Sequence, residues 1–443
     1  MRQRIEGTGL LARIATREAK VGVIGLGYVG LPLGMAFAAG GFPTLGLDVD
    51  VRKVDAISKG NSYIRHIPRD EVARLQAGGK LAASADFGQA AGCDALILCV
   101  PTPLKPTRDP DLSAVEAAGR RIAPHLRPGQ LVVLESTTFP GTTDEVLRPI
   151  LESGGLKAGR DFHLAFSPER EDPANGKFTT RAIPKLVGGL TPACLEAAVA
   201  LYGSVIEKVV PVSSMRVAEL AKLLENVFRC VNIALVNEMK MLCDRMGLDV
   251  WEVIDAAATK PFGYMPFYPG PGLGGHCIPV DPFYLTWKAR EFEFTTRFIE
   301  LAGEINTSMP YYVVQRAIEA LNASGRGVKD ARILALGAAY KKDVDDLRES
   351  PALRIMEMLE EKGAKVEYHD PYVPEAASHR LPGRVWRSVP LDDALSSGMD
   401  AVIILTDHGS IDYADVVARS RLVIDTRNAT RAVTNGREKI VKA

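Results

Sequence analysis

The sequence of 443 residues has little that would mark a nucleic-acid-binding or membrane protein. Its 54 lysines and arginines balance its 54 aspartates and glutamates, so no excess of positive charge favours nucleic acid or an anionic membrane as a partner. No apolar run approaches the roughly 18 residues that a membrane-spanning helix needs. The N-terminal stretch also lacks an apolar segment long enough for a signal peptide. We therefore expect a soluble, cytoplasmic protein whose partners include neither nucleic acid nor membrane.

Cysteine is scarce, and none of the six cysteines form a CxxC pair. The only histidine next to a cysteine is His276, so the ligand spacing of a zinc site is missing. A disulfide framework is not expected in a chain of this length. We expect reduced thiols and no bound metal.

The patterns that are present predict an α/β protein of two or three domains. Strand-like apolar runs alternate with helical segments in the first half and in the last third, with a mainly helical stretch between them. The predicted fold is two doubly wound Rossmann-like domains joined by a long central helix and a helical middle domain. We place a lead-in helix at 1–19, the first Rossmann domain at 20–210, the helical domain at 211–312 and the second Rossmann-like domain at 313–443.

The first strand–turn–helix unit carries a glycine pattern that binds dinucleotides, Gly25-x-Gly27-x-x-Gly30. Gly25 permits the tight turn, Gly27 lets backbone approach a pyrophosphate, and Gly30 lets helix and strand pack closely. Asp48 ends the next strand, 18 residues beyond Gly30. A carboxylate there binds the ribose hydroxyls and repels the 2′-phosphate of NADP. We predict NAD as the cofactor, although the nearby Arg52 is able to accept a phosphate.

Four polar residues follow later strand-like runs of the first half, namely Thr102, Thr137, Glu169 and Arg170. The carboxyl ends of parallel strands form the edge at which ligands bind in this fold. The alternative is that the threonines are ordinary turn and cap residues and that the charges are solvated.

A loop rich in glycine and proline, residues 268–283, delivers a single thiol, Cys277, and a carboxylate four residues later, Asp281. Six glycines and prolines in its first eight residues forbid a regular helix or strand. A lone cysteine on such a loop is a candidate nucleophile. The alternative is a buried thiol beside a tight turn.

Residues 213–246 have the periodicity of a long amphipathic helix. Lys222 and Asn226 are four residues apart and therefore project from one face. They are either a surface stripe or a polar pair aimed into a site. A buried lysine needs a partner or an anionic ligand. The helix is also long enough to serve as the core of a dimer.

The last third has four strand-like runs, and the turn after the first of them lacks the GxGxxG pattern. It should therefore not bind a second dinucleotide in the usual way. The turn presents Lys341, Lys342 and Arg348, and Arg427 follows the last run. Two interpretations of these cations remain open: they bind a phosphate group, or they are ordinary solvated charges.

From about residue 20 to residue 430, the chain resembles the nucleotide-sugar 6-dehydrogenases of the UDP-glucose/UDP-N-acetylhexosamine dehydrogenase family. The motifs that carry the resemblance are GLGYVG at 25–30, VPTP at 100–103, ESTTFPGTT at 135–143, SPER at 167–170, AELAKLLEN at 218–226, GGHCIPVD at 274–281 and YKKDVDDLRES at 340–350. The resemblance implies two successive oxidations of the sugar C6 alcohol to a carboxylate with two NAD, by a homodimer whose last domain binds the UDP-sugar.

The resemblance also implies roles for individual residues. Cys277 is the nucleophile, which forms first a thiohemiacetal and then a thioester with the substrate. Lys222 and Asn226 stabilise the oxygen that becomes anionic. Asp281, with a water near Thr137, takes the first proton, and Glu169 activates the water that hydrolyses the thioester. The implied cofactor-binding residues are Gly25, Gly27, Tyr28, Val29, Gly30, Asp48, Arg52, Thr102, Thr137 and Arg348. The implied substrate-binding residues are Glu169, Arg170, Lys222, Asn226, Tyr268, Gly272, Gly274, Lys341 and Arg427.

The sequence departs from the UDP-glucose branch of that family before and within the thiol loop. Tyr268 and Val280 stand where that branch has lysines, and SPER replaces its Asn-Pro-Glu sequence. The pattern is more similar to the branch that oxidises UDP-N-acetylglucosamine, or its manno epimer, for surface polysaccharide. UDP-N-acetylmannosamine and UDP-glucose are the alternative substrates.

Two other classes of protein share parts of the pattern. An inactive NAD-binding scaffold would not need Cys277, Lys222 and Glu169 together. A single-step dehydrogenase of the 3-hydroxyacid or 6-phosphogluconate type shares the first domain and the long helix, but it needs neither the thiol nor a second α/β domain.

Overall fold

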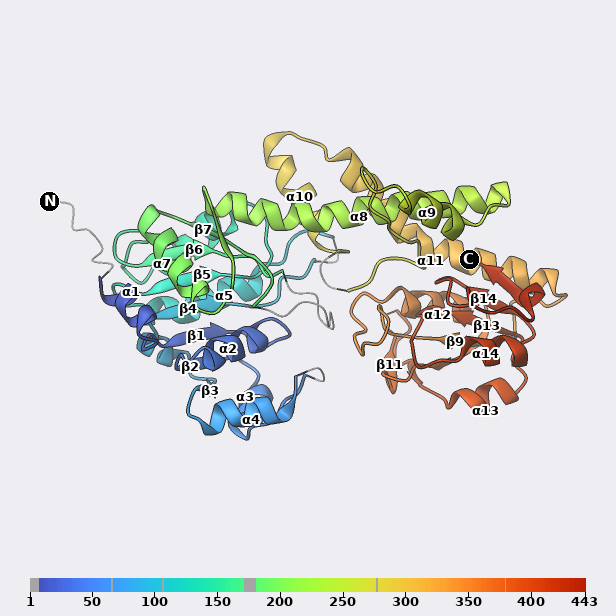
Figure 1. Cartoon of the computed structure of the whole chain (residues 1–443), viewed down its shortest axis with the longest axis horizontal. Helices are drawn as coiled ribbons and strands as arrows, with labels where there is room; N and C mark the ends of the chain where they lie inside the picture. Colours follow the sequence, from blue (N-terminus) through green and yellow to red (C-terminus); the bar gives the residue numbers. More distant parts are fainter. Residues whose placement is uncertain (1–7, 65–66, 106, 171–180, 276–277, 379) are drawn as a thin grey trace. The chain divides into compact units, whose positions relative to one another are not determined.

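The computed structural model describes residues 8–64, 67–105, 107–170, 181–275, 278–378 and 380–443. The chain divides into two compact units. The first unit comprises residues 1–225 and 287–294, and the second comprises residues 226–286 and 295–443. The division falls inside the long helix α8 (Met215–Met246), between Glu225 and Asn226. Figure 1 labels the elements of both units.

The first unit is built on an eight-stranded sheet with the strand order β3-β2-β1-β4-β5-β6-β7-β8. All neighbouring strands are parallel except β6 and β7, which are antiparallel. The strands are β1 (Val21–Ile24), β2 (Thr44–Leu47), β3 (Leu81–Ser84), β4 (Ala95–Leu98), β5 (Leu131–Leu134), β6 (His163–Phe166), β7 (Lys185–Gly189) and β8 (Val209–Val212). The first five parallel strands therefore have the order of a Rossmann domain.

Helices connect these strands and pack on the sheet. They are α1 (Thr8–Ala15), α2 (Gly30–Ala39), α3 (Val51–Ser58), α4 (Arg69–Ala77), α5 (Ser113–Ile122), α6 (Arg148–Glu152) and α7 (Pro192–Gly203), with a π-helical turn at Thr142–Leu147. Every residue of β1, β2, β4, β5 and β6 is buried. Such continuous apolar strands are expected where helices cover both faces of a parallel sheet.

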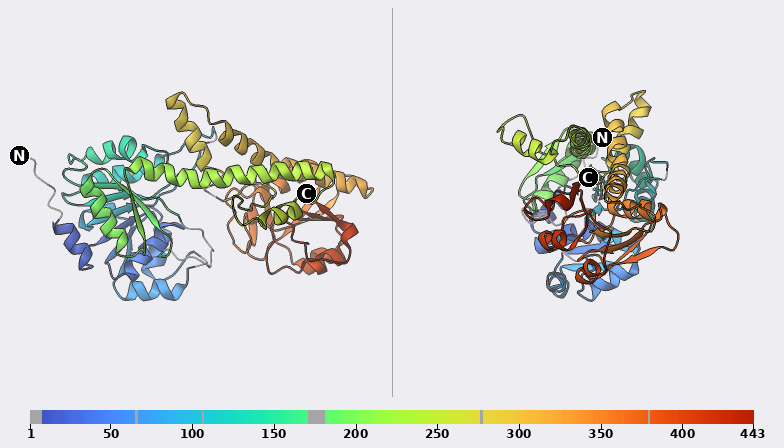
Figure 2. Two further views of the ribbon diagram at one scale, coloured as in Figure 1. Left: turned by 45° about the horizontal axis from the view of Figure 1, so that its top comes forward. Right: turned by 90° about the vertical axis from the view of Figure 1, so that its right-hand side faces the viewer.

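Long helices precede the second α/β domain, as the sequence predicts. The predicted helix at 213–246 is α8, which runs from Met215 to Met246 without a break (Figures 1 and 2). It is followed by α9 (Val250–Ala258), α10 (Asp281–Ala289) and α11 (Arg297–Ala323).

The second unit contains a five-stranded sheet with the order β10-β9-β13-β14-β15, parallel throughout. Its strands are β9 (Arg332–Leu336), β10 (Lys365–His369), β13 (Ala401–Ile404), β14 (Val423–Asp425) and β15 (Ile440–Lys442). The helices α12 (Pro351–Glu361), α13 (Leu391–Ser396) and α14 (Tyr413–Arg419) join them, and β11 (Glu375–Ala377) and β12 (Val385–Arg387) form a small hairpin. The predicted fold class, two Rossmann-like domains with a helical region between them, is confirmed.

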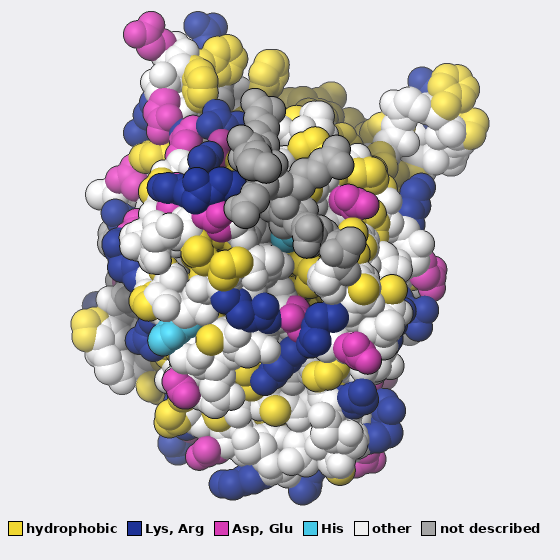
Figure 3. All heavy atoms as spheres, turned by 90° about the vertical axis from the view of Figure 1, so that its left-hand side faces the viewer, with side chains coloured by type: hydrophobic (Ala, Val, Ile, Leu, Met, Phe, Trp, Pro, Cys, Tyr) yellow, Lys and Arg dark blue, Asp and Glu magenta, His cyan; other side chains and the backbone are white. Residues whose placement is uncertain are grey.

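The surface of the first unit carries charges of both signs. Figure 3 shows lysine, arginine, aspartate and glutamate side chains intermixed on the face that it presents. Within the described ranges, no helix is long and apolar enough to cross a membrane. Among the same residues there is no group of three or more histidine, cysteine, aspartate or glutamate side chains placed to hold a metal ion.

Candidate active site

The loop between β1 and α2 has the geometry that a dinucleotide requires. Gly25 has a φ of +91°, and a Cβ there would lie 2.5 Å from the carbonyl oxygen of Cys99. A Cβ at Gly30 would lie 1.8 Å from the carbonyl oxygen of Gly25. A Cβ at Gly27, in contrast, meets no described atom within 4 Å. The protein itself therefore gives no steric reason for a glycine at 27, whereas the close approach of a pyrophosphate does.

Asp48 lies beside this loop at the end of β2. Its carboxylate is buried and accepts hydrogen bonds from the backbone nitrogens of Leu26 (2.7 Å) and Asp50 (2.9 Å). Lys53 of α3 donates to the same carboxylate at 3.1 Å. Asp48 thus fixes the glycine loop and places an acceptor where the fold binds the adenosine ribose.

Arg52 lies close to this acid but pairs with another. Its guanidinium forms two hydrogen bonds with Asp50, at 3.0 and 2.8 Å, and its side chain is 87% exposed. Hydrogen bonds from Arg52 lower the pKa of Asp50 to about 2. The cation that pairs with Asp48 is Lys53, which was not among the site residues predicted from the sequence.

The ends of β4 and β5 meet, as the parallel sheet predicts. The hydroxyl of Thr102 donates to the backbone carbonyl of Thr137 at 2.8 Å, and Ser136 donates to the carbonyl of Val100 at 2.7 Å. These bonds bring the two predicted threonines together at the carboxyl edge of the sheet. The sequence motifs around Thr102 and Thr137 and their spacing did not by themselves predict this hydrogen bond.

The segment after β6 presents Glu169 and Arg170. Arg170 forms an ion pair with Glu225 of α8 at 2.7 Å and donates to the carbonyl of Pro184. Glu169 lies 3.8 Å from the ammonium of Lys185, the first residue of β7. Lys185 also pairs with Glu135, directly after β5. Sequence reasoning missed both of these residues, because neither has a distinctive spacing from Glu169.

Lys222 and Asn226 lie one turn apart on α8, and both are buried. Within the described residues, the ammonium of Lys222 has no hydrogen-bond or ion-pair partner, although the residue is only 5% exposed. Asn226 donates to the carboxylate of Asp281 at 2.5 Å and accepts from Arg229 at 2.9 Å. Asp281 is the first residue of α10 and is 2% exposed.

The described part of the thiol loop packs within the second unit. The backbone nitrogen of Gly270 donates to Asn237 of α8 at 3.1 Å. Gly272 has a φ of +140°. A Cβ at Gly274 would lie 2.4 Å from the Cβ of Tyr340. The hydroxyl of Tyr268 donates to Asp255 of α9 at 2.7 Å. The predicted nucleophile Cys277 lies outside the described residues.

The predicted cations of the last third lie after the carboxyl ends of β9 and β14. Arg427 donates to the carbonyls of Leu405 and Tyr340, and burial lowers its pKa. Arg348 pairs with Asp346 at 2.6 Å, and its carbonyl accepts from Gly275. Lys341 follows Tyr340 in the same turn and is partly buried. The thiol loop and this turn are therefore in contact.

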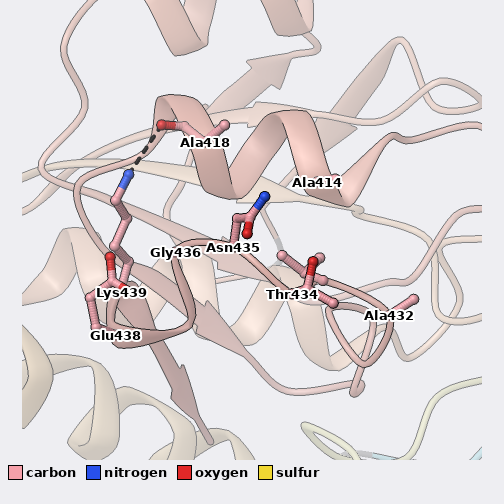
Figure 4. A pocket seen from close by; sticks show the side chains of 9 residues that line it. Ala414, Ala418, Ala432, Thr434, Asn435, Gly436, Glu438 and Lys439 are labelled. Atoms are coloured by element: carbon pink, nitrogen blue, oxygen red, sulfur yellow. Dashed lines mark hydrogen bonds between the residues drawn. The ribbon is translucent and has the colours of Figure 1, made fainter.

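The second unit also has a shallow hollow of about 420 Å³ that contains none of the predicted site residues (Figure 4). It is lined by residues of α14 and of the segment 432–439. Lys439 donates to the carbonyls of Val417 and Ala418, at 3.3 and 3.1 Å. That ammonium satisfies carbonyls at the end of α14, and we assign no ligand to the hollow.

The candidate residues fall into two groups by unit. The first unit contains Glu169, Arg170, Lys222, Thr102, Thr137 and the residues of the NAD loop, Tyr28 and Val29 among them. The second contains Asn226, Asp281, Tyr268, Gly272, Gly274, Lys341, Arg348 and Arg427. In the first unit, the structure brings the hydroxyl of Thr102 to the backbone carbonyl of Thr137, and in the second it brings Asn226 to Asp281.

Three family models match the chain in order. They describe the NAD binding domain (residues 19–206), the central domain (216–308) and the UDP binding domain (334–432) of the UDP-glucose/GDP-mannose dehydrogenase family. The chain belongs to this family. The resemblance seen in the sequence is thereby confirmed, as is NAD as the cofactor, and the chain is an NAD-dependent nucleotide-sugar dehydrogenase.

Relatives match over nearly the whole chain. A UDP-N-acetyl-D-mannosamine dehydrogenase of Yersinia pestis is 35% identical, over 93% of this chain and 99% of its own length. An NDP-N-acetyl-D-galactosaminuronic acid dehydrogenase of Ralstonia nicotianae is 37% identical, over 92% and 95%. The solved structure of a UDP-D-ManNAc dehydrogenase of Pyrococcus horikoshii has a TM-score of 0.83 at 32% identity, over 96% and 98% of the two chains.

Proposed function

We propose that the protein oxidises the C6 hydroxyl of a UDP-N-acetylhexosamine to the uronic acid in two steps, for the synthesis of a surface polysaccharide. The observation that carries this proposal is Lys222, a buried lysine without a partner among the described residues. Most of the Lys222 side chain is buried, but its ammonium is not among the fully buried polar atoms, so the charge is available to an anionic ligand. Oxygen that becomes anionic at C6 during the reaction is such a group.

The remaining residues account for the two oxidations. NAD, when bound, accepts the hydride from C6 in each of them. Asp281 with a water near Thr137 takes the proton of the C6 hydroxyl in the first oxidation. The thiolate of Cys277 then adds to the aldehyde, and loss of the second hydride gives a thioester.

Hydrolysis of the thioester completes the reaction. Glu169 accepts a proton from water, whose oxygen bonds to the carbonyl carbon. The carbon–sulfur bond breaks, Cys277 leaves as the thiolate, and the product is the carboxylate. Asn226 is held by Asp281 and Arg229, so its amide is oriented before substrate binds.

For the sugar, we place UDP-N-acetylmannosamine first, because two of the three relatives described above are named for it. UDP-N-acetylglucosamine, which the sequence pattern favours, is second, and UDP-glucose is third. An acetamido group would make polar contacts that UDP-glucose leaves unpaired, and such a site discriminates strongly against the substrate that lacks the group.

We propose that the enzyme acts as a homodimer in the cytoplasm and that α8 forms the contact between the two copies. Large apolar side chains of this helix remain exposed at positions 217, 220, 224, 228, 235, 242 and 246. Most of these positions recur at intervals of four or seven, which places them on one stripe. Leu235→Glu with Leu242→Glu should give a monomer in light scattering, and a wild-type monomer at micromolar concentration would contradict the proposal.

The deciding experiment compares UDP-sugars as substrates and counts NADH. The three UDP-sugars above should be tested with NAD at saturating concentrations, with UDP-N-acetylgalactosamine included as a fourth. We expect two NADH per sugar consumed. One NADH per sugar would support a single-step dehydrogenase, and none with any sugar would support a scaffold. A higher kcat/KM for UDP-glucose than for every acetamido sugar would overturn the substrate proposal.

A further inference from the structure

A buried charge cluster lies behind Glu169 in the first unit. Lys185 donates a hydrogen bond to one oxygen of Glu135, and the hydroxyl of Tyr202 donates to the other at 2.6 Å. The exposed fractions are 8% for the Lys185 side chain and 0% for that of Glu135, and Tyr202 is also fully buried. Glu135 follows β5, Lys185 begins β7 and Tyr202 belongs to α7. Three elements are therefore joined by one buried carboxylate.

Lys185 faces a second carboxylate as well. Its ammonium lies 3.8 Å from Glu169, whose side chain is 13% exposed. The sheet register explains this position, because Ala165 pairs with Gly189 and Phe166 with Gly188 in the antiparallel β6–β7 ladder. Lys185 lies three residues before Gly188 on β7, and Glu169 lies three residues after Phe166, so both residues lie at the same end of this antiparallel pair.

The charges in the cluster do not cancel. Two carboxylates share one ammonium, and Tyr202 supplies a neutral donor to Glu135. Burial raises the pKa of Glu135 to about 7, against the opposing effect of Lys185. Burial alone would lower the pKa of Lys185, but Glu135 and Glu169 raise it above its usual value. Lys185 therefore stays charged at neutral pH.

We propose that Lys185 is a positioning residue that orients Glu169 and holds it in the anionic form, with Glu135 and Tyr202 fixing Lys185 in place. This inference rests on the proposed role of Glu169 as the base that activates the hydrolytic water. A base must be unprotonated to accept that proton. An opposite charge within about 4–6 Å favours the charged form of a carboxylate. Loss of the Lys185 charge should therefore change the pH dependence of thioester hydrolysis.

The other groups that face the cluster are few in the described part of the first unit. Cys99, directly after β4, interacts electrostatically with both Lys185 and Tyr202. Arg170 adjoins Glu169 in the chain, but its guanidinium pairs with Glu225.

The removal of one partner of a buried pair often costs about 3–5 kcal/mol of stability. A variant that removes both charges is therefore needed beside one that changes Glu135 alone.

Two variants should differ in the acid limb, the fall in the rate of hydrolysis at low pH. Glu135→Gln is nearly isosteric and leaves Lys185 with Glu169 as its carboxylate partner. Because the pKa of Glu135 is about 7, this carboxyl is already protonated at the acid limb, so Glu135→Gln should leave the acid limb where it is. Glu135→Gln with Lys185→Met removes both buried charges and deprives Glu169 of its cation. In that double variant, the acid limb should move to higher pH by about one unit. A purely structural role would shift neither limb.

The experiment measures how fast the thioester adduct on Cys277 disappears in a single turnover of the full-length enzyme at pH values between 5 and 9. Samples are quenched with acid and analysed by intact mass spectrometry. The substrate is whichever UDP-sugar gives the highest kcat/KM. Asp94→Asn is the matched control, because Asp94 pairs with Arg13 and Arg127 in the same unit, directly before β4. That change should lower the melting temperature but leave the acid limb where it is. The affinity for NAD reports whether each variant is folded.

Glu169→Gln separates this inference from the proposed function. If Glu169→Gln stalls hydrolysis but both cluster variants keep the wild-type acid limb, the role of Lys185 is overturned and that of Glu169 stands. If Glu169→Gln hydrolyses the adduct at the wild-type rate, the proposed base is wrong and the inference falls with it. An acid limb that moves to higher pH in the double variant but not in Glu135→Gln, with a stalled Glu169→Gln, establishes the role of Lys185.

Discussion

The side-chain nitrogen of Asn226 donates a hydrogen bond to the carboxylate of Asp281 at 2.5 Å, and both residues are almost fully buried. The orientation of the amide is determined by Arg229, which can only donate and therefore faces the amide oxygen. Asp281 is the first residue of α10, where the helix N-terminus favours a negative charge. The pair thus holds a carboxylate in place only four residues along the chain from Cys277.

This arrangement predicts that Asp281→Asn impairs the first oxidation. The change leaves no carboxylate at position 281 to take the proton of the C6 hydroxyl, and the new amide is able to turn its own NH₂ group toward Asn226. Because general-base catalysis contributes about 10²–10⁴-fold, we expect the first NADH to form at least about 100-fold more slowly. Stopped-flow absorbance of the first turnover measures this rate. Asp392→Asn, which changes an 87% exposed acid paired with Arg419 in the same unit, serves as a control for loss of an acid. Wild-type rates in Asp281→Asn would exclude a role for this acid.

Asp48→Ala should weaken NAD binding and narrow the preference for NAD over NADP. The carboxylate holds the Leu26 nitrogen, and we propose that it also offers an acceptor to the ribose. We expect kcat/KM for NAD to fall by about tenfold or more, which corresponds to about 1.4 kcal/mol. The values for NADP should fall much less, because repulsion of its 2′-phosphate is also lost. Steady-state kinetics with both cofactors measures the ratio. The control is Asp161→Ala, which removes a partly exposed acid paired with Arg160. Equal use of NAD and NADP by the wild type would refute this interpretation of Asp48.

The parts of the site that depend on local pattern could be predicted from the sequence, and the parts that depend on tertiary pairing could not. The glycine loop, Asp48 and α8 follow from spacing and periodicity, and the structure has them where they were expected. Lys185 could not be found, because a lysine at the start of a strand looks like any solvated charge. Its importance comes from an antiparallel register and from Glu135, 50 residues away. The short edge strand β15 was missed for a similar reason, since its three residues carry almost no periodic signal.

The second unit should lose stability as the pH falls below about 4. Asp370 accepts hydrogen bonds from the backbone of Ala338 and Ala339 and from Nε2 of His408. Burial would raise its pKa, but the bond to His408 and the other hydrogen bonds outweigh that effect and lower it from 3.8. A depressed pKa adds stability above the unfolded value, and this stability is lost as the pH falls through the folded value.

Asp370→Asn tests that assignment. The variant should unfold at a lower temperature than the wild type at pH 7, and its melting temperature should depend less on pH between 5 and 3. Circular dichroism melts at several pH values measure both effects. Asp392→Asn is a suitable comparison, because its carboxylate is 87% exposed and pairs with Arg419 on the surface. The same acid dependence in Asp370→Asn and the wild type would assign the loss of stability to other groups.

The covalent mechanism predicts that Cys277 and Glu169 act at different stages. Cys277→Ala removes the thiol that captures the aldehyde, so the enzyme should stop after one oxidation or turn over very slowly. Glu169→Gln keeps the thiol but weakens activation of the hydrolytic water. That variant should release about two NADH per active site in a burst and then slow sharply, because the thioester accumulates.

Intact mass spectrometry identifies the accumulated species. The Glu169→Gln chain should carry the added mass of a uronyl nucleotide, and hydroxylamine should remove it, because hydroxylamine cleaves thioesters. The control is the double variant Cys277→Ala with Glu169→Gln, which should carry no adduct. Lys222→Ala should slow the formation of both NADH molecules, since each oxidation develops charge on the C6 oxygen. Full two-step turnover in Cys277→Ala, or an unmodified Glu169→Gln chain after the burst, would show that the second oxidation does not pass through a thioester on this cysteine.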